Sequence, residues 1–356
     1  MGVIKIGGRL LGDGQPVFIV FEAGPTHDGL EAACKLVDVA ADAGADAVKF
    51  QIVDADSLVP DRDLQFAYQA LKNRKTGELE DVSESLWAIL KRRELSFSEW
   101  DAVIEHCRKR DIAFFSTVTN QTELEFLAAR KVETVKICSG DVTYYHLLRQ
   151  VSREPWSVQI DTGGATLAEV EQAVEVLEEA GCDKIIVNHC PSGYPARLES
   201  VNLKVLPTLR TMYPDCVVAF SDHTPGRDMD VAAVALGVHM IEKTITLDRA
   251  TRSPEHVMSL EPHEAADFVR AIRDVEKGLG MPRRLMSPEE RKTREVARRS
   301  LYAARDLAGG TTLSQGDLAY ARPGGGIPAN RDGEALGRRL KTEVRKGEPL
   351  AFSNLE

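Results

Sequence analysis

The chain has 356 residues, of which 43% are hydrophobic and 28% are charged, and its formal net charge at pH 7 is −10. This composition predicts a globular protein with a large apolar core and excludes an intrinsically disordered chain. The negative charge argues against nucleic acid or an anionic membrane as a partner, because both need a basic surface. No apolar run reaches the roughly 18 residues of a membrane-spanning helix, so we expect no membrane span.

The charge is unevenly distributed along the chain. Residues 298–356 carry a net charge of +3, which leaves −13 on residues 1–297. Such a basic segment docks on the acidic body, faces an anion, or is solvated surface charge. The six cysteines form no C-x-x-C motif, and no secretory apolar segment stands at the N-terminus. We therefore expect a cytoplasmic protein without a disulfide framework.

Short β-rich runs alternate with longer segments of helical periodicity. The eight predicted strands are Val17–Gly24, Ala47–Val53, Ile112–Val118, Thr134–Gly140, Ser157–Gly163, Lys184–Cys190, Cys216–His223 and Met240–Thr246. The clearest predicted helices are Leu30–Gly44, Thr166–Ala180, Met229–Leu236 and Pro262–Leu279. Strands that alternate with helices predict a parallel sheet, and eight such units close most simply into an α/β (β/α)8 TIM barrel.

Three segments do not fit this alternation. Asp54–Arg93 is long and charged, which indicates an excursion over the barrel mouth. Residues 281–295 hold prolines and many charges, which is typical of a linker. Residues 296–356 contain nine of the 27 glycines and only short apolar runs. We therefore predict a barrel domain over 1–280, a linker over 281–295, and a small β-rich C-terminal domain over 296–356.

In a TIM barrel the functional residues come from the C-terminal ends of the strands. Here those ends are polar, with Glu22, Lys49, Gln51, Thr117, Lys136, Ser139, Asp161, His189, Ser221, Asp222, His223, Glu242 and Lys243. Lysines and hydroxyls on several strands suit a phosphorylated or carboxylated small molecule, and we expect Lys49, Lys136 and Lys243 to share the barrel mouth. The acids and histidines, His27 included, could transfer protons or hold a divalent metal. For Asp222 and His189, a structural hydrogen bond to the backbone is the equal alternative.

Ten short motifs follow one another along the chain. They are Phe21-Glu-Ala-Gly-Pro-Thr-His-Asp-Gly, Gly44-Ala-Asp-Ala-Val-Lys-Phe-Gln, Val135-Lys-Ile-Cys-Ser-Gly-Asp, Asp161-Thr-Gly, His189-Cys-Pro-Ser-Gly-Tyr-Pro, Phe220-Ser-Asp-His-Thr, Ile241-Glu-Lys, Ser253-Pro-Glu-His, Ala297-Arg-Arg-Ser-Leu and Arg322-Pro-Gly-Gly-Gly-Ile. With them the chain resembles the sialic acid synthase family over nearly its whole length. The resemblance implies a TIM barrel followed by an antifreeze-like (SAF) domain. It also implies condensation of phosphoenolpyruvate (PEP) with an N-acyl aldose, which gives a 2-keto-3-deoxy sugar acid and phosphate.

The resemblance further implies roles for individual residues. Glu22, Lys49 and Lys136 would be catalytic, with Glu22 in proton transfer. The residues implied to bind PEP are Lys49, Thr117, Lys136, Ser139 and Ser221. Gln51, Tyr194 and Glu255 would contact the sugar. Arg322 would reach the sugar from the SAF domain of the partner subunit in a domain-swapped homodimer.

The implied metal site departs from the family pattern. The family holds Mn²⁺ or Mg²⁺ with two histidines, of which His223 matches the first, whereas Thr244 takes the place of the second. Asp161 stands where relatives have a serine. A threonine hydroxyl is a poor substitute for imidazole. We therefore hypothesise that Asp161 and His223 share a relocated or weaker site for the divalent metal.

Two other functions compete with the PEP-dependent synthase. A Schiff-base aldolase on the same barrel would use Lys136 or Lys243 as its amine. A non-catalytic sugar-binding protein, or a member with altered chemistry, would explain the missing second histidine. Phosphate release from PEP distinguishes the synthase from both alternatives.

Overall fold

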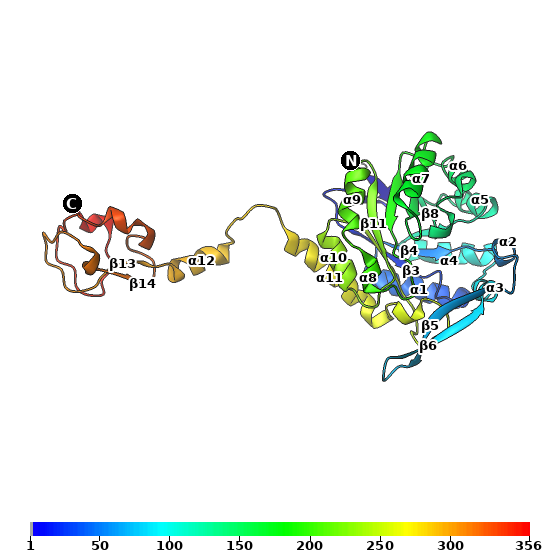
Figure 1. Cartoon of the computed structure of the whole chain (residues 1–356), viewed down its shortest axis with the longest axis horizontal. Helices are drawn as coiled ribbons and strands as arrows, with labels where there is room; N and C mark the ends of the chain where they lie inside the picture. Colours follow the sequence, from blue (N-terminus) through cyan, green and yellow to red (C-terminus); the bar gives the residue numbers. More distant parts are fainter. Residues whose placement is uncertain (1–2) are drawn as a thin grey trace. The chain divides into compact units, whose positions relative to one another are not determined.

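The computed structural model describes residues 3–356, which fall into a first compact unit that ends at Gly280 and a second that spans Met281–Glu356. The first unit contains the parallel strands β3 (Phe18–Glu22), β4 (Ala47–Gln51), β7 (Ala113–Thr117), β8 (Thr134–Ile137), β9 (Ser157–Asp161), β10 (Ile185–His189), β11 (Val217–Asp222) and β12 (Met240–Thr244). They close into a barrel in the order β10-β11-β12-β3-β4-β7-β8-β9. Figure 1 labels four of these strands, β3, β4, β8 and β11. Each predicted strand contains one barrel strand, so the prediction of a TIM barrel is confirmed.

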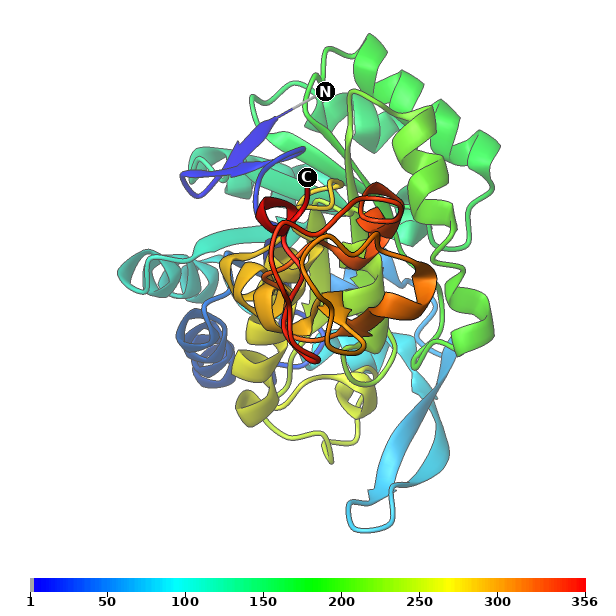
Figure 2. The same cartoon turned by 90° about the vertical axis from the view of Figure 1, so that its left-hand side faces the viewer.

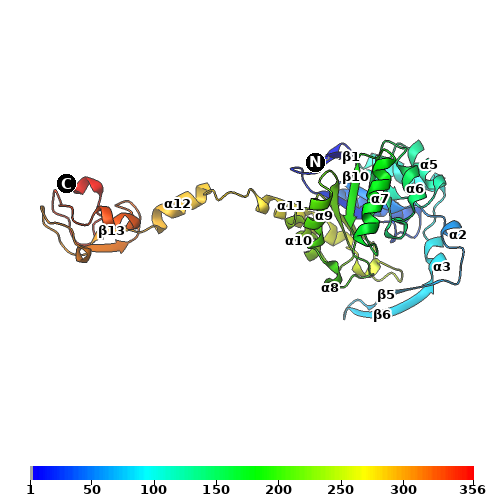
Figure 3. The ribbon, with the colours of Figure 1, turned by 45° about the horizontal axis from the view of Figure 1, so that its top comes forward.

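Helices surround this barrel, and several of them are visible beside the strands in Figure 3. They are α1 (Leu30–Ala43), α4 (Phe97–Lys109), α5 (Gln121–Ala129), α6 (Tyr145–Val151), α7 (Leu167–Glu179), α8 (Leu198–Val201), α9 (Val205–Met212), α10 (Asp228–Ala235) and α11 (Pro262–Leu279). The short 3₁₀ turns η1 (Ser139–Asp141) and η2 (His256–Met258) lie in the loops after β8 and β12. Local signals fix the helix ends: Thr166 and Glu169 form a capping box at the start of α7, and Gly44 ends α1 with a left-handed φ of 82°.

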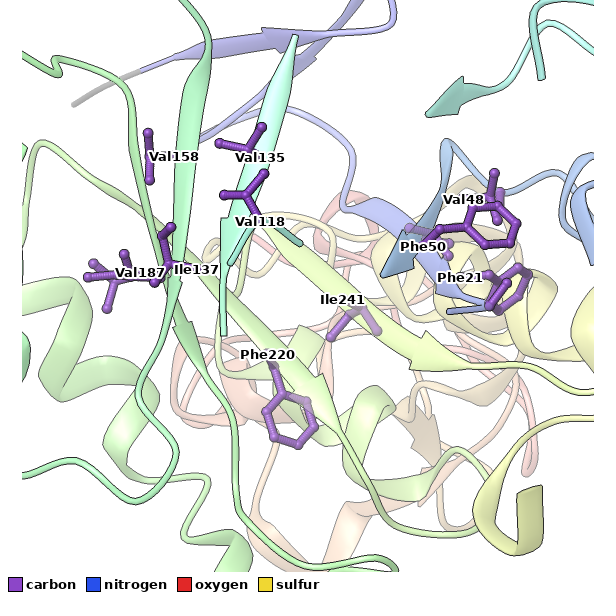
Figure 4. Close-up of a cluster of buried hydrophobic side chains, with 14 of the residues drawn as sticks. Phe21, Val48, Phe50, Val118, Val135, Ile137, Val158, Val187, Phe220 and Ile241 are labelled. Carbon is purple, nitrogen blue, oxygen red and sulfur yellow. The ribbon is translucent and has the colours of Figure 1, made fainter. Parts of the chain in front are cut away.

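Alternation along the strands sends every second side chain outward. These side chains, among them Phe21, Val48, Val187 and Ile241, pack with the helices in the larger apolar cluster of the molecule (Figure 4). The residues between them point into the barrel. The inward-pointing residues, which alternate with these along each strand, therefore line the barrel interior.

The N-terminal end of the barrel is closed by a hairpin. Strands β1 (Ile4–Ile6) and β2 (Arg9–Leu11) pair antiparallel. Ile4, Ile6 and Leu11 are buried in one cluster with the inward-facing residues of the strand starts, which are Phe18, Val20, Ala47, Phe115, Ile186, Val217, Ala219 and Met240. Within residues 3–356 the lower half of the interior is thus apolar, and the polar side chains of the strands lie towards the C-terminal end.

The segment between β4 and α4 forms the largest insertion in the barrel. It contains α2 (Ala55–Leu58), β5 (Gln65–Asn73), β6 (Glu78–Ser85) and α3 (Leu86–Lys91). Strands β5 and β6 make a twisted antiparallel ribbon that extends away from the barrel (Figure 2). At the turn of this ribbon Arg74 contacts Asp248 at 2.5 Å and Glu261 at 2.6 Å, in the loop after β12. The ribbon is thereby tied to a second loop at the same end of the barrel.

The second unit begins with α12 (Pro288–Ala297). It continues with the antiparallel pair β13 (Ser300–Ala303) and β14 (Leu318–Ala321) and the 3₁₀ turns η3 (Gln315–Asp317), η4 (Ala329–Glu334) and η5 (Phe352–Asn354). Isolated bridges such as Leu307 to Val344 extend the pairing. Its own core includes Leu301, Ile327 and Leu350. All six cysteines of the chain are free. Among residues 3–356 there is no helix with the length and apolar character needed to cross a bilayer.

Candidate active site

A pocket of about 560 Å³ opens at the C-terminal ends of the barrel strands. Its lining includes the predicted site residues Glu22, Lys49, Gln51, Thr117, Lys136, Ser139, Asp161, Tyr194, His223 and Glu255. Ser221 lies beside this set and donates to Glu242 Oε1 at 3.2 Å. Arg322 directly follows β14, in the second unit.

The floor of the pocket is a network of buried charges. Lys49 pairs with Glu22, and its Nζ also lies 3.6 Å from Glu242 Oε1. Lys136 Nζ contacts the same Glu242 oxygen at 2.6 Å and Asp161 Oδ2 at 2.9 Å. Glu242 thus bridges two lysines that stand on different strands, with every one of these side chains buried.

Neighbouring polar groups hold the two acids of this network in place. Gln159 Nε2 donates to Glu242 Oε2 at 3.2 Å. Asn188 Nδ2 donates to Asp161 Oδ1 at 2.6 Å. At the next strand, Glu22 Oε1 accepts from the Gly24 amide at 2.6 Å. The carboxylates are therefore oriented before any ligand arrives, which is the arrangement expected of a preorganised site.

The two lysines differ in their electrostatics. Burial lowers the pKa of Lys49 by more than the nearby Glu242 raises it. Burial also opposes the charge on Lys136, but Asp161 and Glu242 outweigh it and raise the pKa of that lysine. The two lysines together hold the pKa of Glu242 below its usual range despite its burial. Lys136 is accordingly a fixed cation, whereas Lys49 is the more easily deprotonated ammonium.

The upper part of the pocket is built from loops. The ring of Tyr194 lies 5.0 Å from that of His223 and 6.2 Å from that of Phe66, measured between centroids. Glu255 adopts a left-handed φ of 75°, which is uncommon for a residue with a side chain, and its carbonyl accepts from Ser259 Oγ at 2.6 Å. Strained backbone of this kind is concentrated at functional sites.

Donors suited to a divalent ion are present in the pocket. His223 Nδ1 lies 3.0 Å from the Pro191 carbonyl, which fixes the ring and leaves Nε2 as the ligand atom. Each Asp161 oxygen makes one contact, with Asn188 or Lys136, and retains a lone pair for an ion. The lining carries five carboxylates against three lysine and arginine side chains, so it has an excess of negative charge. These residues fit Mn²⁺ or Mg²⁺, for which oxygen and imidazole ligands are suitable.

A second group of possible metal ligands lies away from the pocket. Glu261, His263 and Glu264 bring ligand atoms within 4.8 Å of one another at the start of α11. Both glutamates are already neutralised, Glu261 by Arg74 and Glu264 by Arg249. This group therefore stabilises the start of α11 and the loop that precedes it.

The expectation that Lys243 shares the barrel mouth is wrong. Glu242 points into the barrel, so Lys243, the next residue on β12, points outward beneath α10. There its Nζ binds Asp222, the Thr224 carbonyl at 2.6 Å and Asp230 Oδ2 at 3.2 Å. Asp222 is turned the same way and also accepts from the Thr224 amide.

Two of the candidate histidines are likewise structural. His189 Nε2 contacts the Val201 carbonyl at 2.6 Å, and its ring stacks on Phe220 outside the barrel. His27 packs edge-on against Phe50 and Trp100, and neither of its ring nitrogens has a hydrogen-bond partner among residues 3–356. Neither side chain is part of the pocket lining.

The burial of His27 predicts a loss of stability in acid. Burial, with a smaller contribution from Arg93, lowers the pKa of His27 from 6.5 to about 4. The unfolded chain takes up a proton below pH 6.5, so the stabilisation is complete above that pH and is lost as the pH falls towards 4. The full loss is about 3 kcal/mol. His27→Phe, which keeps an aromatic ring between Phe50 and Trp100, should lose less stability over this range. Urea unfolding at pH 7 and pH 5 measures the difference, and identical pH dependence in both proteins would contradict the assignment.

The sequence left the roles of four residues that build the site unassigned. Gln159 and Asn188 hold Glu242 and Asp161. Each is a polar residue in an otherwise apolar strand, and this is the sequence signal that could have indicated its role. Glu242 was recognised only as one acid among several, whereas it is the centre of the network. Arg93 is buried in the lining and donates to Ser253 Oγ at 3.1 Å, but in the sequence it is one charged residue within a charged segment.

Comparison with known proteins agrees with this arrangement. The model of the NeuB family matches residues 36–284, and that of the SAF domain matches residues 298–356. The chain is 36% identical over 337 residues to N,N'-diacetyllegionaminic acid synthase of Campylobacter jejuni, with 94% of this chain and 98% of the relative covered. It is 34% identical to the enzyme of the same name from Legionella pneumophila, with 97% and 96% covered.

A solved structure shows the same likeness. The crystal structure of N-acetylneuraminic acid synthetase from Leptospira borgpetersenii, in complex with citrate, superimposes with a TM-score of 0.70 at 29% identity, over 82% of this chain and 94% of that one. The family model covers more than half of the chain, and the SAF match follows it directly. The chain therefore belongs to the NeuB family of sialic and related nonulosonic acid synthases, with a C-terminal SAF domain.

Proposed function

We propose that the protein condenses PEP with an N-acylated aldose and releases a 2-keto-3-deoxy sugar acid and inorganic phosphate. The observation that carries this proposal is the pair of buried lysines, Lys49 and Lys136, bridged by Glu242 at the C-terminal end of the barrel. Buried ammonium groups are costly without anionic partners. A ligand with a phosphate and a carboxylate extends the same pattern, with Thr117 and Ser139 as further donors in the lining.

The reaction forms one carbon–carbon bond and breaks one carbon–oxygen bond. C3 of PEP attacks the aldehyde carbon, water adds at C2, and the C2–O bond to phosphate breaks so that the water oxygen becomes the keto oxygen. Water loses two protons as it becomes the keto oxygen, of which one is balanced by protonation of the aldehyde oxygen to a hydroxyl and the other leaves with the phosphate. The aldehyde oxygen therefore needs one proton when the carbon–carbon bond forms. The Lys49 and Glu22 pair is suited to supply it, because Lys49 has a lowered pKa and Glu22 can receive the replacement proton.

Other residues of the pocket bind and orient the two substrates. Lys136 stays charged and would neutralise an anionic oxygen of PEP, which also separates that oxygen from Asp161. Gln51, Tyr194 and Glu255 face the remaining space and would hold the sugar. A divalent ion held by His223 and Asp161 would supply Lewis-acid polarisation of the aldehyde.

The charge of the pocket supports two further parts of the proposal. A lining with more carboxylates than cations repels PEP unless additional positive charge is brought in. The divalent ion is one source of that charge. Arg322, in a unit with an excess of basic residues, would be the other, supplied by the partner subunit of a domain-swapped homodimer.

Neither candidate amine, Lys136 or Lys243, is suited to the Schiff-base mechanism. Lys243 lies outside the pocket, bound to Asp222 and Asp230. Lys136 is held as an ammonium by Asp161 and Glu242. An ammonium has no lone pair with which to attack a carbonyl.

Phosphate release tests the proposal. The full-length protein, PEP and N-acetylmannosamine are incubated with Mn²⁺ or with EDTA, and phosphate and 2-keto-3-deoxy acid are assayed together. We expect the two products in equal amounts, with less of both in EDTA. Borohydride treatment in the presence of pyruvate should leave the protein unmodified. A trapped adduct without phosphate release would favour an aldolase, and sugar binding without either would favour a non-catalytic protein.

A further inference from the structure

Arg93 differs from the two lysines of the pocket lining. Lys49 and Lys136 each contact two carboxylates on the floor. Arg93 is 6% exposed and lines the same pocket, yet within residues 3–356 its side chain forms no ion pair and donates only to Ser253 Oγ, at 3.1 Å. A guanidinium carries N–H donors on all three of its nitrogens, so most of its hydrogen-bonding capacity is unused.

The unpaired guanidinium is costly for the folded protein. Burial lowers the pKa of Arg93 to about 10, and the charge of Glu255 is the largest influence that opposes this shift. The side chain therefore remains a cation at neutral pH, without the partners that usually compensate a buried charge. A buried cation in the lining of a pocket is suited to a ligand that supplies the missing acceptor atoms.

The surroundings of Arg93 determine which kind of ligand atom it can hold. Its bond to Ser253 joins the insertion after β4 to the loop after β12, in which Glu255 also lines the pocket. The negative charge of Glu255 would repel a phosphate or a carboxylate at this point. A hydroxyl satisfies both residues, because its oxygen accepts from the guanidinium while its proton is donated to the carboxylate.

We propose that Arg93 binds a hydroxyl group of the aldose acceptor and shares that hydroxyl with Glu255. The ionised oxygens of PEP only accept hydrogen bonds, so PEP is held instead by Lys49 and Lys136 on the floor. This inference rests on the proposed condensation and adds a residue that fixes the position of the acceptor in the pocket.

Arg93→Met tests the inference by two measurements on the full-length protein. In steady-state phosphate release with PEP and N-acetylmannosamine, the acceptor KM should rise about 10- to 100-fold, as expected for loss of a hydrogen bond to a charged group. The KM for PEP should stay unchanged. Thermal unfolding should show a Tm that is unchanged or higher, because methionine replaces the side chain without a buried charge. Arg93→Lys keeps the charge without the planar fork and should give an intermediate acceptor KM.

Arg92→Met is the matched control. Arg92 is the preceding residue and pairs with Glu84 at 2.8 Å, but its side chain is 45% exposed and outside the pocket lining. Its replacement should leave both KM values unchanged, and the Tm should fall slightly because a surface ion pair is lost. The two neighbouring arginines thus separate a loss of charge from the insertion from a loss of acceptor binding.

A double variant tests whether the hydroxyl is shared. Glu255→Gln should also raise the acceptor KM. Arg93→Met combined with Glu255→Gln should raise it by less than the product of the two single effects, because the two hydrogen bonds of one hydroxyl strengthen each other. Two effects that simply multiply would overturn the sharing of one hydroxyl.

The outcomes separate this inference from the proposed function. Phosphate release with an unchanged acceptor KM in Arg93→Met overturns the inference and leaves the condensation standing, as does a rise in the KM for PEP alone. A large decrease in Tm or a loss of folding in Arg93→Met assigns Arg93 to the structure of the insertion and also overturns the inference. Absence of phosphate release by the parent protein overturns both.

Discussion

Glu22→Gln should lower kcat for phosphate release from PEP by about 10²- to 10⁴-fold, the usual contribution of a positioned acid or base. The glutamine can keep its oxygen on the Gly24 amide, as Glu22 Oε1 does now. Its amide nitrogen then faces Lys49 Nζ, so two donors meet where a carboxylate and an ammonium met before. The proton supply through Lys49 is lost while the shape of the side chain is retained. Steady-state kinetics with saturating PEP and acceptor measure the effect.

Glu123→Gln is the control for this variant. Glu123 is also buried, but it accepts hydrogen bonds from Thr119 and Asn120 at the start of α5 and is outside the lining of the pocket. Its replacement should leave kcat unchanged. A Glu22→Gln protein with kcat within threefold of the parent would remove Glu22 from the proton transfer.

Lys243→Met should destabilise the folded protein by about 3–5 kcal/mol, because it removes the cation from a buried cluster with two carboxyl groups. Asp222 and Asp230 are both fully buried, and Lys243 is the cation between them. Burial raises the pKa of Asp230 well above its ordinary value, and the Lys243 ammonium is the group that opposes this shift. Without Lys243, the two buried carboxyl groups face each other with no cation between them. Thermal unfolding should show a decrease in Tm of roughly 10 °C.

Lys277→Met is the matched surface change. The Lys277 side chain is 80% exposed and lies 3.8 Å from Asp274. Surface substitutions of this kind change stability by about 0.5 kcal/mol or less. Adding Asp222→Asn to Lys243→Met should restore part of the lost stability. A Lys243→Met protein as stable as Lys277→Met would show that the buried cluster contributes little.

The barrel strands could be predicted because their signal is local. Each strand is rich in apolar and β-branched residues and is bounded by glycine or polar residues. Along the chain the strands alternate with amphipathic helices. The ribbon of β5 and β6 was not predicted. Strand β6 is mostly charged and polar, and the buried apolar members of the ribbon, Tyr68, Ala70 and Val82, are too few to distinguish a ribbon from a charged loop.

The errors within the site have one cause. The position at which a strand ends is visible in the sequence, but the face to which each residue turns depends on register within the barrel. Glu242 and Lys243 are adjacent and both charged, so nothing local tells which one points inward. The same ambiguity applies to Ser221 and Asp222. The structure resolves it, because Met240 belongs to the interior cluster and two residues later Glu242 must point the same way.

The hairpin that closes the N-terminal end of the barrel has a kinetic consequence. With Ile4, Ile6 and Leu11 filling that end, substrates and products share a single route through the mouth beside the ribbon. In the proposed condensation, PEP on the deep lysine-lined floor would have to arrive before the acceptor, and the acceptor would then block its exit. For that reaction, the closed end of the barrel would favour ordered binding and would commit PEP once both substrates are present.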